Sequence, residues 1–143
     1  MEPCRFCSIV SGDVESQIVL EDDETLAFLD SRPLFPGHSL LVPREHVETL
    51  VELPDRLFPA LFGNARLLAR AMETGMDAEG SFVAINNRVS QSVPHLHVHV
   101  VPRTKGDGLR GFFWPRQKYR DDAHAAETAE RLRAAVARLG GKH

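Results

Sequence analysis

His95, His97 and His99 stand at alternate positions of an apolar run in the middle of the chain. Successive side chains of a β-strand point to opposite faces, so a strand here gathers three imidazoles on one face and leaves the apolar residues for the core. Residues on one face repeat every ~6.6 Å, close to the spacing of a phosphate chain whose oxygens need donors. The simpler alternative is a strand whose polar side chains face solvent. The clustering of histidine favours a chemical role for this face.

The two cysteines, Cys4 and Cys7, form a second group. Thiolates at this spacing need two further ligands to complete a tetrahedral zinc site, and the candidates are His46 and His95. If His95 is a ligand, its role is structural, because it then ties the N-terminal segment and the His46 loop to the histidine strand. Free thiols are one alternative. Thioredoxin-like redox chemistry is another, but no βαβ pattern accompanies the pair.

Composition bounds the class of protein. A chain of 143 residues, 43% of them hydrophobic, is long enough for one well-buried core, so we expect a single domain over 1–143. A net charge of -3 and a pI near 6.1 argue against a general nucleic-acid binder. No apolar run approaches the ~20 residues of a membrane span, and the N-terminus lacks a signal-peptide pattern. We therefore expect a cytoplasmic protein with no nucleic-acid or membrane partner.

The elements that must position these side chains are short. Apolar runs between turn signals predict strands at residues 17–20, 25–29, 39–42, 82–85 and 95–101. Helical spacing and end signals predict helices at residues 6–10, 57–72 and about 121–139. Two prolines stiffen the loop 31–37, which delivers His38 to the third strand. Short connections permit antiparallel pairing, so the expected fold is α+β, with helices packed against an antiparallel five-stranded sheet.

With these motifs the chain resembles the histidine triad (HIT) family over roughly residues 4–103. The resemblance is carried by Pro36-Gly37-His38 and the triad, with support from residues 4–7, 26–30 and 91–94. It implies a HIT-like fold with a core at about 4–103 and a C-terminal substrate loop and helix at about 104–143. It also implies a homodimer whose two sheets join into one, and a hydrolase or transferase that acts on a purine nucleotide. Bacterial members of the family with such a cysteine pair look like zinc-binding proteins, so the resemblance also implies zinc.

The histidines have separate expected roles. A neutral imidazole nitrogen is a good nucleophile near pH 7, and its attack on phosphorus gives a nucleotidyl-histidine intermediate. His97 lies between two other histidines and matches the nucleophile of the family. We expect its second ring nitrogen to donate to a backbone carbonyl, which fixes the tautomer. His99 and His38 would donate to the non-bridging oxygens, where charge builds up. Ser92 would help to protonate the leaving group, or would be an ordinary turn residue.

The other candidates would bind the nucleotide. Asp30 can accept hydrogen bonds from both ribose hydroxyls, as the resemblance implies, or can form a turn or cap. Gln91 can reach the same phosphate as Ser92. Asn86 begins the turn 86–91, which is shorter than in many relatives. The base would lie against an apolar wall whose members could equally be ordinary core: Phe6, Ile9, Phe28 and Leu29.

Residues 105–120 hold four aromatic and five basic side chains in an otherwise acidic protein. Aromatic faces stack bases and cations pair with phosphates, so we place Trp114, Arg116 and Lys118 on the leaving-group side of the substrate. The alternative is a dimer interface or a loop that covers the core.

Three functions fit these patterns. The first is hydrolysis or nucleotidyl transfer at the α-phosphorus of a nucleoside phosphoramidate or a dinucleoside polyphosphate. The second is a nucleotide-binding interaction module with little turnover, which a turnover assay would distinguish. The third is a metallohydrolase that uses the histidine row as ligands, although the carboxylate that usually completes such a site is not evident in the motif.

Overall fold

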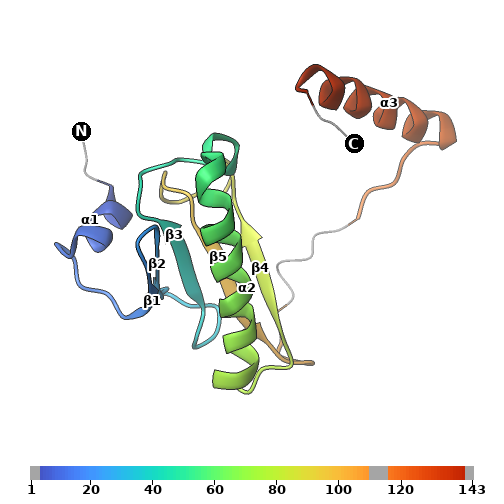
Figure 1. The fold of residues 1–143 in the computed structure, drawn as a ribbon. Helices are drawn as coiled ribbons and strands as arrows, with labels where there is room; N and C mark the ends of the chain where they lie inside the picture. Colours follow the sequence, from blue (N-terminus) through green and yellow to red (C-terminus); the bar gives the residue numbers. More distant parts are fainter. Residues whose placement is uncertain (1–3, 110–115, 141–143) are drawn as a thin grey trace. The chain divides into compact units, whose positions relative to one another are not determined.

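The computed structural model describes residues 4–109 and 116–140. The chain divides into two compact units, Met1–Asp107 and Gly108–His143. The first holds a five-stranded sheet with helices α1 and α2, and the second holds helix α3 (Figure 1). Within the described ranges, no helix is long and apolar enough to cross a membrane.

The five strands form one antiparallel sheet in the order β1-β2-β3-β5-β4. Their bounds are Ile18–Glu21 (β1), Thr25–Leu29 (β2), Ser39–Pro43 (β3), Gly80–Ile85 (β4) and Val98–Arg103 (β5). The α+β fold expected from the short connections is confirmed. The pairing that matters most for function is that of β3 with β5, because it places Leu40 opposite His99.

Helices α1 (Arg5–Ser11) and α2 (Phe58–Gly75) pack against different sides of the strands. The apolar side of α2 forms a buried cluster with alternate strand residues that include Leu41, Val98 and Val100. The α1 side chains Phe6 and Ile9 form a second cluster with the intervening strand residues, among them Phe28 and Leu40. Two-residue alternation along each strand separates the two clusters.

This alternation determines where the histidines point. Val98 and Val100 belong to the α2 cluster, so His99 between them must face the α1 side. The Phe6 ring lies edge-on to the rings of His95 and His97, at centroid distances of 6.0 and 5.0 Å. All three histidine rings therefore lie on the side of the sheet that α1 covers.

The strand expected over 95–101 begins only at Val98. The preceding backbone pairs elsewhere, because the Leu96 amide donates to the Val47 carbonyl at 2.7 Å. Val47 belongs to the loop that follows β3, so His95 and His97 lie in a segment held by this loop and not by the sheet. The strand prediction was too long here because alternation in sequence does not show which partner takes the backbone hydrogen bonds.

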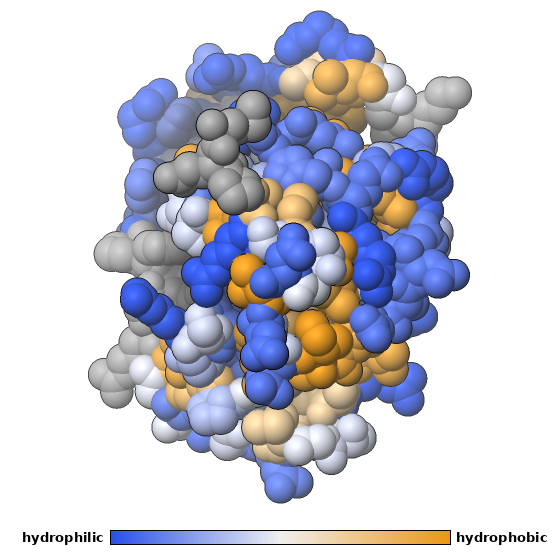
Figure 2. All heavy atoms as spheres, turned by 90° about the vertical axis from the view of Figure 1, so that its left-hand side faces the viewer, coloured by the Kyte–Doolittle hydropathy of each residue, from blue (hydrophilic) through white to orange (hydrophobic). Residues whose placement is uncertain are grey.

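Helix α1 has well-defined ends. The Cys4 thiol accepts a hydrogen bond from the Cys7 amide at 3.4 Å, and Gly12 adopts a left-handed conformation with φ of 87°. Such a φ costs a glycine little, and so the helix ends where the sequence predicts. Figure 2 shows the side on which α1 and β1 lie, where apolar side chains emerge among hydrophilic ones.

The second unit contains α3 (Asp122–Arg138), which Asp121 caps by accepting from the His124 amide at 2.8 Å. The predicted apolar residues Leu132 and Val136 are 63% and 47% exposed.

Candidate functional site

A chain of hydrogen bonds fixes the protons on two of the histidines. The Leu34 amide donates to Nδ1 of His38 at 3.0 Å, so a neutral His38 carries its proton on Nε2. This nitrogen lies 3.0 Å from Nδ1 of His99, which therefore accepts. His99 then keeps its own proton on Nε2 and can donate it to a ligand.

Burial keeps both rings neutral. His38 is 3% exposed, and burial lowers its pKa, although the Asp30 carboxylate 3.7 Å from Nε2 acts in the opposite direction. Burial lowers the pKa of His99 to about 4, and the neighbouring His97 and His38 add to this effect. The pair is therefore uncharged near pH 7 and acts through its hydrogen bonds.

The low pKa of His99 predicts a loss of stability in acid. The pKa is about 4 in the folded protein and 6.5 for the unperturbed side chain, so the unfolded state takes up the proton first as the pH falls. As the pH falls from 6.5 to 4, this difference in pKa should lower the free energy of unfolding by at most about 3 kcal/mol. The value is an upper limit because the ring of His99 is partly exposed and solvent screens its interactions. Urea unfolding at pH 7 and 4.5 should show a larger acid loss for the wild type than for His99→Gln. Parallel losses in the two proteins would contradict the assignment.

His97 carries its proton on the other nitrogen. Its Nδ1 lies 2.8 Å from the carbonyl oxygen of His95, which can only accept, so Nδ1 is protonated and Nε2 keeps a lone pair. This is the hydrogen bond expected from the sequence. The rings of His97 and His99 lie 5.0 Å apart between centroids. The two rings thus offer a lone pair and a proton donor side by side.

A cavity of about 160 Å³ opens beside these rings. Eight of the predicted site residues line it: Phe6, Ile9, Phe28, Leu29, Asp30, Ser92, His97 and His99. Most of the apolar wall is core as well, since Phe6 and Phe28 are 5% and 2% exposed and their rings meet edge-on at 5.3 Å. Arg5 and Glu15 also line the cavity, although neither is among the site residues predicted from the sequence.

Asp30 forms a turn, and one of its two carboxylate oxygens takes no part in that turn. One carboxylate oxygen accepts from the Arg32 amide at 2.9 Å, as a turn-forming aspartate does. The other lies near His38, and the side chain is 22% exposed at the cavity. The turn therefore leaves an oxygen available to a ligand.

Three predicted residues lie elsewhere. His38 bonds through Nε2 to Nδ1 of His99 and is not among the described residues that line the cavity, whereas the sequence suggested a direct contact with the phosphate. Gln91 donates to the Glu48 carbonyl at 2.6 Å and accepts from the Arg88 amide at 2.8 Å, which fastens the turn before the triad. Among the described residues that line the cavity, neither Gln91 nor Asn86 is present.

The residues proposed for the leaving-group side lie in the second unit. Trp114 lies outside the described residues. Arg116 and Lys118 are described and exposed.

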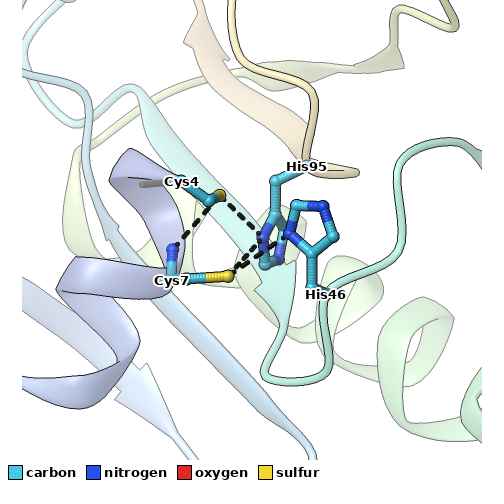
Figure 3. A group of neighbouring side chains, drawn as sticks. All are labelled: Cys4, Cys7, His46 and His95. Atoms are coloured by element: carbon cyan, nitrogen blue, oxygen red, sulfur yellow. Dashed lines mark hydrogen bonds between the residues drawn. The ribbon is translucent and has the colours of Figure 1, made fainter. Parts of the chain in front are cut away.

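The four candidate zinc ligands converge (Figure 3). Cys4 and Cys7 come from the start of α1, His46 from the loop after β3, and His95 from the segment before β5. The ligand atoms all lie within 4.8 Å of one another. Sulfur to Nδ1 distances are 3.4 Å from Cys4 to His95, 3.3 Å from Cys7 to His46 and 3.5 Å from Cys7 to His95.

This donor set fits zinc. Tetrahedral bonds of ordinary length to sulfur and nitrogen separate the two ligand atoms by about 3.6 Å, close to the observed spacing. Nε2 of His95 lies 2.9 Å from the Pro43 carbonyl and so carries the proton, which leaves the Nδ1 lone pair facing the thiols. Burial, with a contribution from Cys4, raises the pKa of the Cys7 thiol to about 11, whereas a reactive redox thiol needs a lowered pKa.

A second group of possible metal ligands is Asp30, His38 and His99. Both ring nitrogens of His38 already have hydrogen-bond partners, the Leu34 amide and His99. The group is therefore satisfied without an ion, which weakens the metallohydrolase alternative.

Comparison with known proteins is consistent with this geometry. The HIT domain model matches residues 11–106. The chain is 36% identical over 140 residues to Protein hit of Bacillus subtilis (strain 168), covering 96% of this chain and 94% of that protein. It is 33% identical over 108 residues to adenylylsulfatase HINT3 of Arabidopsis thaliana, covering 74% of this chain and 55% of that protein. It is also similar to the crystal structure of a Zn-bound histidine triad family protein from Mycobacterium smegmatis, with a TM-score of 0.72, 37% identity, and coverage of 95% of this chain and 94% of the other.

Proposed function

Because the chain belongs to the HIT family, we propose that it acts at the α-phosphorus of nucleoside phosphoramidates or dinucleoside polyphosphates, as a hydrolase or nucleotidyl transferase. Family membership and the similarity to an adenylylsulfatase point to nucleotide hydrolase or transferase activity in general. The observation that supports the finer proposal is the complementary protonation of His97 and His99 beside one cavity.

In the first chemical step, Nε2 of His97 attacks the α-phosphorus. A bond forms between nitrogen and phosphorus, and the bond to the leaving group breaks, with its electron pair going to the leaving atom. Ser92 lines the cavity and donates a hydrogen bond to that atom, which takes up a proton from solvent water; the second step returns a proton to the solvent. The His95 carbonyl, through the proton on Nδ1, stabilises the positive charge that the ring acquires.

The second step releases the nucleotide. Water attacks the phosphorus of the nucleotidyl-histidine, the bond to His97 breaks, and the lone pair returns to Nε2. A nucleoside monophosphate and a proton leave. With an alcohol or phosphate in place of water, the same step is nucleotidyl transfer.

His99 stabilises the charge that builds up on phosphorus in both steps. Nε2 of His99 donates a hydrogen bond to a non-bridging oxygen, and His38 holds the ring in the tautomer that carries this proton. Such a donor acts without reorganisation, because the backbone amide of Leu34 fixes the whole chain of bonds in advance.

The nucleoside occupies the remaining part of the cavity. The free oxygen of Asp30 accepts from the ribose, and a purine base lies on the apolar wall that includes Phe6 and Ile9. Trp114, Arg116 and Lys118 remain our candidates for the leaving-group side.

We further propose a homodimer whose two sheets join. β1 and β4 are the edge strands of the described sheet, and an edge strand offers unpaired backbone groups to a second copy.

The test is a labelled-intermediate assay. Adenosine phosphoramidates and diadenosine polyphosphates labelled at the α-phosphorus should both be compared, and one or both should leave label on His97 in rapidly quenched protein. Binding without turnover would identify an interaction module. Turnover with no label on protein would favour a metallohydrolase, in which water attacks phosphorus directly.

A further inference from the structure

We infer that His95 is a positioning residue that couples the Cys4, Cys7 and His46 cluster to the proton on His97. The inference rests on the proposed function, because it concerns the proposed nucleophile. The ring of His95 belongs to the metal-binding cluster, and its carbonyl belongs to the catalytic site. A single residue thus belongs to both sites, through its ring to the cluster and through its carbonyl to the His97 proton.

Every polar atom of His95 has a partner. The side chain is fully buried, at 0% exposure, and its amide donates to the Val93 carbonyl at 2.8 Å. Nε2 donates to the Pro43 carbonyl, and Nδ1 faces the two thiols. The carbonyl oxygen accepts from Nδ1 of His97 at 2.8 Å. His95 therefore contacts both sites, the thiols through its ring and His97 through its carbonyl.

The sheet does not hold this carbonyl. β5 begins at Val98, so His95 and His97 precede the paired residues. The adjoining Leu96 amide donates to Val47, the residue after His46. The segment is consequently anchored to the same loop that supplies a ligand of the cluster, and movement of the loop moves the acceptor of the His97 proton.

The consequence for His97 is a choice between tautomers. While the four ligand side chains are held together, the His95 carbonyl keeps the proton of His97 on Nδ1 and the lone pair on Nε2. When the cluster opens, this acceptor is displaced, and a neutral imidazole distributes its proton over both nitrogens. The molecules with a proton on Nε2 have no lone pair there for attack.

The experiment measures directly which ring nitrogen of His97 carries the proton. Protein labelled with ¹⁵N-histidine and loaded with zinc is examined by long-range ¹H–¹⁵N correlation spectra of the rings, and His97→Gln identifies the His97 signals. Three proteins are compared: the wild type, His46→Gln, which removes an exposed ligand outside the cavity, and Glu45→Gln, a matched change at the neighbouring exposed position. Circular dichroism verifies that each is folded.

We expect a single Nδ1-protonated form of His97 in the wild type and in Glu45→Gln, and a mixture of tautomers in His46→Gln. Turnover by His46→Gln should fall about 10-fold to 100-fold, the scale seen when a group that orients a functional histidine is lost, because the His95 carbonyl no longer orients His97. Chelation of zinc from the wild type should give the same mixture, and added zinc should reverse it.

A single tautomer in both folded His46→Gln and zinc-free wild type would overturn the inference, as would purified wild type that binds no zinc. The spectra do not depend on turnover. A zinc-dependent tautomer in a protein that turns over no nucleotide would support the coupling and refute the proposed function, so the two failures are distinguishable.

Discussion

Replacement of His97 by alanine should reduce turnover at least ~10³-fold, the scale of effect seen when a covalent nucleophile is removed. The change removes the lone pair on Nε2. Among the described residues that line the cavity, His99 is the other imidazole, and it cannot replace His97 because its Nε2 carries a proton. Nucleotide binding should persist, because Asp30 and the apolar wall are untouched. Single-turnover kinetics and equilibrium binding of a nucleoside monophosphate measure the two effects separately.

The structure adds a condition to this experiment. His97 is 3% exposed and packs against Phe6, whereas its sequence pattern suggests an open strand face. Alanine therefore leaves a small void, and His97→Gln is the better-packed companion variant. His124→Ala, in the second unit, is the control for histidine loss. Turnover within tenfold of the wild type would rule out His97 as the nucleophile.

The purified protein should carry about one zinc per chain, and Cys4→Ser should abolish tight binding and lower the Tm by about 10 °C or more. Structural zinc contributes many kcal/mol in small domains, and ~1 kcal/mol shifts the Tm of a domain of this size by about 4 °C. Serine can still cap α1 in place of the Cys4 thiol, so the loss reports on the ligand and not on the helix end. Elemental analysis and calorimetry measure the two quantities.

The matched control is Ser11→Ala, at the other end of α1, which should retain zinc and Tm. Acidification should release the metal, because thiolate ligands must be deprotonated. In Cys4→Ser the loss of turnover, expressed as a free energy, should be smaller than the loss in free energy of unfolding. The reason is that the site positions the nucleophile and takes no part in the chemistry. Protein prepared without chelator that contains no zinc would contradict the assignment.

Local chemistry could be predicted from the sequence where it depends on residue type and spacing. The alternation around His97, the glycine that ends α1 and the apolar spacing of α2 each specify a short-range geometry, and the structure shows that geometry. The cysteine pair likewise requires two more ligands, and few histidines were available to supply them.

What escaped prediction depends on contacts between distant loops. The late start of β5 follows from the Leu96 bond to Val47, and the indirect position of His38 follows from the fold of the loop around Leu34. Gln91 has a side chain suited to phosphate but bonds to the backbone of Glu48 instead. No spacing in the sequence encodes which loop carbonyl a side chain will meet.

The short helix α1 also bears on how the protein folds. Its seven residues are too few to persist alone, and the contact of its Cys7 with His95 closes a separation of 88 residues. Contacts between neighbouring elements, such as the hairpin of β1 and β2, cost far less chain entropy to form. We therefore expect the sheet and α2 to assemble first and α1 to dock last. Since α1 supplies one wall of the cavity, the chain has no completed pocket in which to capture a nucleotide until α1 has docked.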